Sequence, residues 1–330
     1  GNGTDGHVYA LLALPNGELI AGGSFQHAGG VAANNIAKWN GASWTSLGEG
    51  LSAEVYTLAY GRGIGGGGRV FAGGRFYTAG GTSARCIAQW DGTMWSPLGS
   101  GANEAVWSLV ATPNAAGESD IIAGGAFTSM GGVDASNIAR WDGAQWHALG
   151  SGVNGSFDAV YSLATLPDGA GRTNVIAAGS FPAMGDVPAR YIARWNGSDW
   201  FTLGQGTDRT VVALTVAPDG TGGSDLVVGG TFTSAGGLPA VRIARFGSPC
   251  RCQADLDNGQ GFGSTASTKD GAVTIDDLLF YLAIFEAGDL RADVDDGSAT
   301  GTRCTQARSC DSLKRSTTRW IASPSGPVHF

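Results

Sequence analysis

The chain of 330 residues has few of the side chains on which metalloenzymes and nucleic-acid-binding proteins depend. Its four histidines lie at unrelated positions, so no histidine cluster with metal-ligand spacing is present. Only 15% of the residues are charged and the net charge is −8, which argues against a phosphate-binding surface of clustered Lys and Arg. No apolar run approaches the ~20 residues of a transmembrane helix. We therefore expect neither a nucleic-acid partner nor a transmembrane segment.

Missing sequence motifs exclude further classes of protein. Serine nucleophile elbows, phosphate-binding Walker loops and HExxH zinc motifs are missing. The 11 prolines and the irregular glycine spacing exclude collagen. What the chain has instead is 56 glycines together with 10 Trp, 7 Tyr and 13 Phe. Many glycines in a chain with enough aromatic surface for a core indicate many turns and short strands.

An internal repeat decides the architecture. The tryptophan of the string IAKWNG and a preceding Gly-Gly pair recur together at intervals of 51 to 54 residues. The tryptophan position is occupied by Trp39, Trp90, Trp141, Trp195 and Phe246. Five copies result, at about 1–50, 51–101, 102–152, 153–206 and 207–249.

Each copy contains four short strand candidates, which in the first copy are VYALLAL, ELIAGGSF, NIAKW and SWTSLG. The third and fourth candidates flank Asn-Gly or Asp-Gly, as at Asn40-Gly41, which favours a hairpin with a type I′ turn. Trp39 and Trp44 then lie on one face, and the same pair recurs in the next three copies. We expect the paired tryptophans to pack between neighbouring sheets; the alternative is an aromatic platform for sugars.

These features resemble a known family. Four antiparallel strands per repeat of about 50 residues match the kelch-type β-propeller blade. The string GGxFxxxGG…IAxWdGxxWxxLGxG is similar to repeats of galactose-oxidase-like propellers, bacterial secreted proteins and fungal cortical polarity markers. The resemblance covers residues 1–249 and implies an all-β fold, a β-propeller of four-stranded antiparallel blades. Propellers host enzymes, binders and scaffolds alike, so it implies no single function.

The first copy begins just after the position of a fourth strand, and the fifth ends at RFGSPC, before its own. We expect a fourth strand, and whole blades, upstream of residue 1.

One set of polar side chains is a candidate binding site. An acidic residue precedes the first strand of every copy, one to three residues ahead of the aligned valine. If that strand is innermost, the carboxylates would ring one mouth of the central channel, where they could hold a cation or a glycan, or hydrolyse a glycosidic bond. The alternative is that they solvate surface loops. The five residues are Asp5, Glu54, Glu104, Asp158 and Asp208.

After Cys250 the composition changes, and residues 250–302 carry 3 basic and 10 acidic residues. The stretch 270–279, DGAVTIDDLL, resembles the second half of an EF-hand-type loop that opens a helix over residues 276–288. The helix is apolar enough to disfavour the alternative of an acidic linker. Oxygen ligands for calcium are predicted from Asp255, Asp257, Asp270, the carbonyl of Ala272 and Asp277.

The motif restarts at Asp293 and Asp295, which form a partial second site. A duplicated calcium loop and helix resembles the enlarged-loop dockerin-like modules of secreted planctomycete-type proteins. The second unit then fails, because residues 303–330 are basic, with five cations and one acid, and match neither module. We interpret residues 303–330 as a frameshifted or disordered tail. Five cysteines, with Cys250 and Cys252 at the boundary, favour an oxidising, secretory context.

Together these patterns predict a secreted or cell-surface, non-catalytic β-propeller that binds a glycan or a protein. The dockerin resemblance implies calcium as cofactor and a cohesin-like or other surface protein as partner. The alternative is a propeller glycoside hydrolase, or another carbohydrate-active enzyme, that uses the acidic ring.

Overall fold

The computed structural model describes residues 3–153, 155, 158–167, 172–219, 223–247 and 319–321. The predicted calcium module at 250–302 and most of the basic tail lie outside the described residues.

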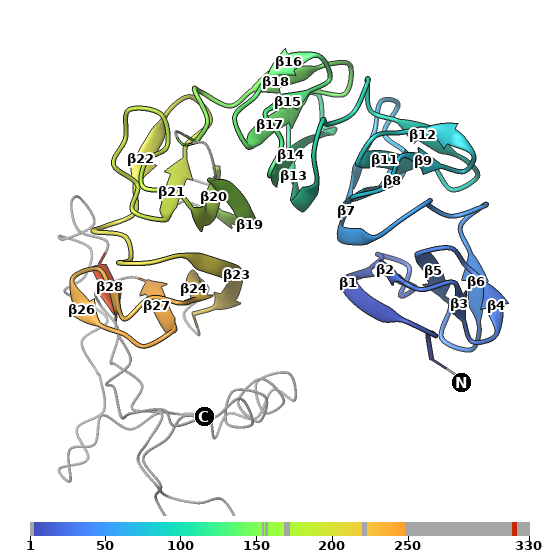
Figure 1. Cartoon of the computed structure of the whole chain (residues 1–330), viewed down its shortest axis with the longest axis horizontal. Coiled ribbons are helices and arrows are strands. Elements are labelled where there is room, and N and C mark those ends of the chain that lie inside the picture. Colours follow the sequence, from blue (N-terminus) through green and yellow to red (C-terminus); the bar gives the residue numbers. More distant parts are fainter. Residues whose placement is uncertain are drawn as a thin grey trace, which may run out of the picture.

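The described chain forms five four-stranded antiparallel sheets, each a blade of a β-propeller (Figure 1). They correspond to the five repeats, so the all-β prediction with four strands per repeat is confirmed. From the first to the fourth strand of each blade, the strands are β1 (His7–Ala13), β2 (Leu19–Ser24), β5 (Ile36–Trp39) and β6 (Trp44–Ser46) in blade 1; β7 (Val55–Arg62), β8 (Gly68–Gly74), β11 (Ile87–Trp90) and β12 (Trp95–Pro97) in blade 2; β13 (Val106–Pro113), β14 (Ser119–Gly125), β17 (Ile138–Trp141) and β18 (Trp146–Ala148) in blade 3; β19 (Ala159–Pro167), β20 (Thr173–Ser180), β21 (Ile192–Trp195) and β22 (Trp200–Thr202) in blade 4; and β23 (Val211–Pro218), β24 (Ser224–Gly230), β27 (Ile243–Gly247) and β28 (Arg319–Ile321) in blade 5.

Short hairpins occupy the loop between the second and third strands in four of the blades. They are formed by β3 (His27–Ala28) and β4 (Val31–Ala32), β9 (Thr78–Ala79) and β10 (Thr82–Ser83), β15 (Ser129–Met130) and β16 (Val133–Asp134), and β25 (Ser234–Ala235) and β26 (Leu238–Pro239).

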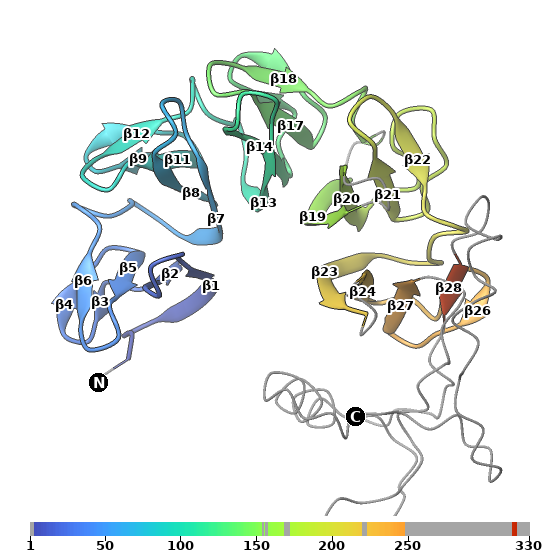
Figure 2. The same ribbon diagram turned by 180° about the vertical axis from the view of Figure 1, so that it is seen from behind.

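The first strand of every blade is innermost, as the kelch resemblance implied. Neighbouring innermost strands contact one another in chain order, from β1 through β7, β13 and β19 to β23. Both views show them facing a common centre, with the arc of blades open between blade 1 and blade 5 (Figures 1 and 2).

The outer hairpins of blades 1 to 4 have a four-residue loop. Trp39 pairs directly with Trp44, with ring centroids 5.4 Å apart, and the other three tryptophan pairs repeat this register. The Asn40 side chain accepts hydrogen bonds from the backbone N–H groups of Ala42 and Ser43. Only Gly41 then needs a positive φ, of 95°. The hairpin prediction is confirmed, but the type I′ turn is wrong, because the asparagine side chain closes the loop and its own φ is not positive.

Valine and leucine side chains of one blade pack onto a glycine of the preceding blade. A Cβ placed on Gly22 would lie 2.6 Å from Cγ1 of Val55 and 3.4 Å from Cδ1 of Leu58. Gly73 and Gly124 have the same relation to the valines of blades 3 and 4. The first glycine of the Gly-Gly pair therefore lets two sheets approach closely in blades 1 to 3, and Ala178 takes its place in blade 4.

Hydrogen bonds also join neighbouring blades. The indole N–H of Trp95 donates to the carbonyl of Leu47 in blade 1 at 2.8 Å, and Trp146 and Trp200 do the same one and two blades later. This confirms that the outer tryptophans pack between sheets. On the inner strands, the backbone N–H of Leu109 donates to the Thr57 hydroxyl of the preceding blade at 3.1 Å. Equivalent bonds run from Leu163 to Ser108 and from Leu214 to Ser162.

The fourth strand of blade 5 comes from the basic tail. β28 pairs antiparallel with β27, with Phe246 opposite Trp320. This is the register of the tryptophan pairs in the other blades. At residues 319–321 the tail thus supplies the strand that the repeat lacks, although the rest of its sequence matches no blade.

Candidate functional site

Each innermost strand contains a β-bulge, and the residue at the bulge has no partner in the ladder. The ladder of each first strand shifts by one residue at the same place, as between Val8 and Ala10. The residue skipped by the ladder is aromatic in four blades. These positions are Tyr9, Tyr56, Trp107, Tyr161 and Val212.

The four bulge aromatics form contacts between blades. The rings of Tyr9 and Tyr56 lie 5.6 Å apart between centroids. Trp107 and Tyr161 stack at 4.9 Å with an interplanar angle of 19°. Tyr9 is 50% exposed, and the other three are half-buried. We call these four side chains the aromatic row.

The five carboxylates predicted at the channel mouth fall into two groups. Asp5 and Asp208 stabilise loops: Asp5 accepts hydrogen bonds from the backbone N–H groups of Gln26 and His27, and Asp208 accepts the equivalent pair in blade 5. Ser52 and Asn103 do the same in blades 2 and 3.

The hydrogen bonds set the charge of these two acids. The backbone N–H and the ring of His27 hold the pKa of Asp5 at about 2. For Asp208, partial burial favours the neutral form, but hydrogen bonds from Thr233 and Ser234 lower its pKa overall. Both are therefore ionised at neutral pH and engaged with backbone.

Glu54, Glu104 and Asp158 lie closer to the innermost strands, one or two residues before the aligned valine. Burial, and then the carboxylate of Glu54, raise the pKa of Tyr56. Burial alone raises the pKa of Asp158. Three acids of neighbouring blades thus lie two or three residues before the bulge aromatics, at the start of strands β7, β13 and β19.

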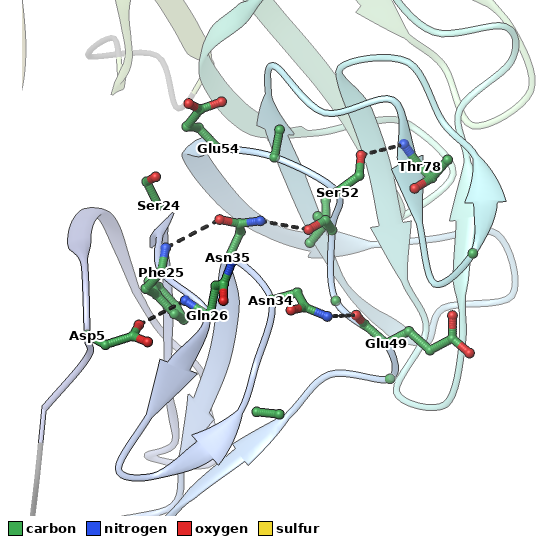
Figure 3. Close-up of a pocket in the computed structure, with 16 residues that line it drawn as sticks. Asp5, Ser24, Phe25, Gln26, Asn34, Asn35, Glu49, Ser52, Glu54 and Thr78 are labelled. Atoms are coloured by element: carbon green, nitrogen blue, oxygen red, sulfur yellow. Dashed lines mark hydrogen bonds between the residues drawn. The ribbon is translucent and has the colours of Figure 1, made fainter.

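A wide polar pocket lies between blades 1 and 2, with a volume of about 970 Å³ (Figure 3). The carboxylates of Asp5, Glu49 and Glu54 border it. Asn34 donates to the carbonyl of Glu49 at 2.9 Å, and Asn35 to that of Leu51 at 2.8 Å, so these amides hold the connection between the two blades.

Among the described residues, metal-ligating and thiol side chains contribute little to a candidate site. Within the described ranges, no three His, Cys, Asp or Glu side chains are grouped to hold a metal ion. Cys86 is a free thiol, 5% exposed, and burial followed by the Glu104 carboxylate raises its pKa to about 11. Cys86 is therefore a small buried side chain rather than a reactive thiol. The predicted calcium ligands lie outside the described residues.

Sequence reasoning missed the aromatic row, although its signal is visible. The second residue of VYALLAL, VYTLAY, VWSLVAT and VYSLATL is aromatic in every case, next to a valine that is buried in three of the four blades. An aromatic directly beside a buried valine in a strand is expected to face the other way, and at a bulge it drops out of the ladder.

Comparisons with known proteins agree on the fold. A family model described as a domain of unknown function, DUF5122 beta-propeller, matches residues 14–40 and 224–248. These segments contain the second and third strands of blades 1 and 5. No curated protein matches the chain. No helix among the described residues is long and apolar enough to cross a bilayer.

Three solved structures are similar at low identity. A GH74 enzyme of Niastella koreensis is 15% identical, with a TM-score of 0.46 over 74% of this chain and 36% of that one. An ancestral GH74 enzyme is 15% identical, with a TM-score of 0.48 over 75% and 30%. The GH74 xyloglucanase of Xanthomonas campestris is 14% identical, with a TM-score of 0.40 over 71% and 29%. The chain spans about a third of the length of these structures, and similarity at this level says nothing about activity.

Proposed function

We propose that the chain is a non-catalytic β-propeller that binds a neutral or cationic polysaccharide along the aromatic row. The rings of the row, one exposed and three half-buried, carry the proposal. Aromatic faces pack against the apolar faces of sugar rings, and neighbouring carboxylates accept hydrogen bonds from hydroxyl groups. The net charge of −8 and the three acids beside the row disfavour polyanions.

Binding to soluble polysaccharides tests the proposal. We expect calorimetry to detect binding of a neutral β-glucan or of chitosan, but not of polygalacturonate. Replacing Trp107 and Tyr161 together by alanine removes the stacked pair and should weaken binding about tenfold, which corresponds to about 1.4 kcal/mol. The matched control is Tyr77→Ala, because Tyr77 is 61% exposed and lies outside the row. Binding that survives the double substitution, or no binding to any of the polymers, would overturn the proposal.

A glycoside hydrolase is the second candidate, and one observation favours it. Burial raises the pKa of Asp158, as a general acid in sugar hydrolysis requires. The same polysaccharides incubated with the protein would then release reducing ends, and Asp158→Asn or Glu104→Gln would abolish the release. Binding without any release supports the non-catalytic function.

We further propose that residues 250–302 form a calcium-dependent dockerin-like module that attaches the protein to a cohesin-like or other surface partner outside the cell. Asp255, Asp257, Asp270, the Ala272 carbonyl and Asp277 would supply hard oxygen ligands, and extracellular calcium is abundant enough for a weak site. In a melt of the full chain, EDTA should lower a transition temperature and excess calcium should restore it. A melt unchanged by EDTA would remove the module.

A further inference from the structure

Three Asn-Gly pairs lie within the described residues, in two different kinds of loop. Asn40-Gly41 and Asn196-Gly197 open the outer hairpin loops of blades 1 and 4, and Asn16-Gly17 lies in the turn between β1 and β2. In an Asn-Gly pair the glycine nitrogen can attack the side-chain amide carbon of the asparagine, because glycine has no side chain to obstruct the approach. The hydrogen bonds around each pair decide whether the fold assists this attack.

In the outer hairpin loop of blade 1, the attacking nitrogen is free and the amide carbonyl is activated. No described group accepts a hydrogen bond from the backbone N–H of Gly41. Oδ1 of Asn40 accepts hydrogen bonds from the backbone N–H groups of Ala42 and Ser43, both at 2.9 Å. Negative charge develops on this oxygen when the amide carbon is attacked, so the two donors act as an oxyanion hole does.

A proton donor lies beside the leaving group of Asn40. The hydroxyl oxygen of Ser43 is 3.4 Å from Nδ2 of Asn40. The amide nitrogen has to gain a proton before it leaves as ammonia, and a hydroxyl at this position can supply the proton and be reprotonated by water. Residues 40–43 are all exposed, so water has access to the whole loop.

The loop of blade 4 repeats the free nitrogen and the activated carbonyl. Oδ1 of Asn196 accepts hydrogen bonds from the backbone N–H groups of Ser198 and Asp199, both at 2.9 Å. The Ser198 hydroxyl donates to the same oxygen at 3.1 Å. The backbone N–H of Gly197 has no acceptor in the part of the chain that the structure describes. Asn196 is therefore activated in the same way as Asn40.

Asn16-Gly17 is exposed like Asn40-Gly41 but is bonded differently. The backbone N–H of Gly17 donates to the carbonyl of Leu14 at 2.9 Å, so the attacking nitrogen is engaged. Oδ1 of Asn16 accepts one backbone hydrogen bond, from Glu18 at 3.1 Å. Nδ2 donates to the Glu18 carboxylate at 2.8 Å. Hydrogen bonds from Lys38 and then from Asn16 lower the pKa of this carboxyl, so it is ionised at neutral pH and has no proton to give.

We propose that the fold directs spontaneous deamidation to Asn40 and Asn196 and protects Asn16. In blade 1 the Gly41 nitrogen forms a bond to Cγ of Asn40 and loses its proton to water. The bond from Cγ to Nδ2 then breaks, and ammonia leaves behind a cyclic succinimide. Water opens the ring at either carbonyl and yields aspartate or isoaspartate. Water is the only co-reactant, and each conversion makes the net charge of −8 more negative by one unit.

The loop accommodates the aspartate product. Asp91 stands at the position of Asn40 in blade 2 and accepts the same pair of backbone hydrogen bonds, at 2.8 and 2.9 Å. Isoaspartate carries an additional main-chain atom, and we expect it to disturb the register of Trp39 with Trp44. Deamidation to aspartate therefore adds charge to the outer hairpins without unfolding them.

Peptide mapping by mass spectrometry, after incubation of the full chain at mildly alkaline pH, tests the proposal. In the folded protein, Asn40 and Asn196 should deamidate at least about tenfold faster than Asn16. In the same chain unfolded in guanidinium chloride, the three pairs should react at similar rates, because the dipeptide is the same. The comparison of the two conditions isolates the contribution of the fold. Equal rates at the three sites in the folded protein, or a faster reaction at Asn16, would overturn the proposal.

Ser43→Ala tests the proton donor separately. Met94 and Gln145 occupy this position in blades 2 and 3, so the hairpin should remain folded. The rate at Asn40 should fall severalfold, and the rate at Asn196 in the same sample, which serves as the internal control, should not change. A rate at Asn40 equal to that of the unmodified protein would overturn the role assigned to the Ser43 hydroxyl.

Discussion

Blade 3 and blade 1 contain the same motif in different surroundings. In blade 3, neighbours cover both faces of the sheet, and Val106 and Trp146 are 0% and 3% exposed. In blade 1 only one face is covered, and the equivalent Val8 is 41% exposed. The repeat therefore encodes the contact between blades as much as the blade itself, and burial of a given residue depends on whether a neighbour is present.

The largest expected effect separates Gly124 of blade 3, which Val160 of the next blade covers, from Gly229 of blade 5, which no described side chain covers. Gly124→Val places side-chain atoms where Val160 packs and should destabilise the protein by about 3 kcal/mol. Gly229→Val meets open space and should change the free energy of unfolding by less than about 0.5 kcal/mol. Urea unfolding measures both. Equal losses of stability would show that Gly229 is as closely covered as Gly124.

A smaller effect separates the outer tryptophans. Trp146→Phe removes the hydrogen bond from the indole to the carbonyl of Leu98, which then keeps only the bond from the backbone N–H of Gly101 at 3.3 Å. Trp44→Phe removes no such bond. Trp146 is 3% exposed whereas Trp44 is half-buried, so Trp146→Phe loses both the bond and more buried indole surface. It should be less stable than Trp44→Phe by at least about 1 kcal/mol. If the two lose the same stability, the indole bond contributes nothing to the contact.

The smallest effect is expected in the outer hairpins, whose loops make the same hydrogen bonds whether or not a neighbouring blade is present. In the outer hairpin of blade 2, backbone N–H groups of Met94 and Thr93 donate to Asp91 and hold its pKa at about 2. Because the folded pKa is below the unfolded value near 3.8, the stabilisation is complete above pH 4 and is lost as pH falls toward 2.

Asp91→Asn tests this, since Asn40 fills the same position in blade 1 with the same bonds. Melting temperatures of the variant and the parent should coincide at pH 7, and the parent should lose more between pH 4 and pH 2. Parallel melting profiles down to pH 2 would contradict the assigned role of the carboxylate.

The strand order and the blade count were predictable because period, turn residues and apolar runs recur five times. The loop type in the hairpins was not, since Asn40 closes its loop by a side-chain bond that no propensity distinguishes from a type I′ turn. The sequence also did not predict β28, because pairing between strands far apart in the sequence depends on which strand edge the rest of the fold leaves unpaired.

The candidate site was predictable only in part. Acids at the strand entrances were found, but spacing alone did not separate Asp5, which binds backbone, from Glu54, which accompanies Tyr56. Asp5 lies two residues further from its strand than Glu54 does. Only the fold shows which of these carboxylates accepts hydrogen bonds from a pair of backbone N–H groups. The aromatic row depends on a bulge, and a one-residue shift in a ladder leaves no periodic trace.

The strand β28 makes the integrity of blade 5 depend on an unbroken backbone. β27 and β28 are hydrogen-bonded neighbours, yet residues 248–318 separate them along the chain. While that stretch is intact, its ends are held close together and the strand returns at a high effective concentration. A single proteolytic cut within it would convert β28 into a peptide that can dissociate, so proteolysis there would act on the propeller itself.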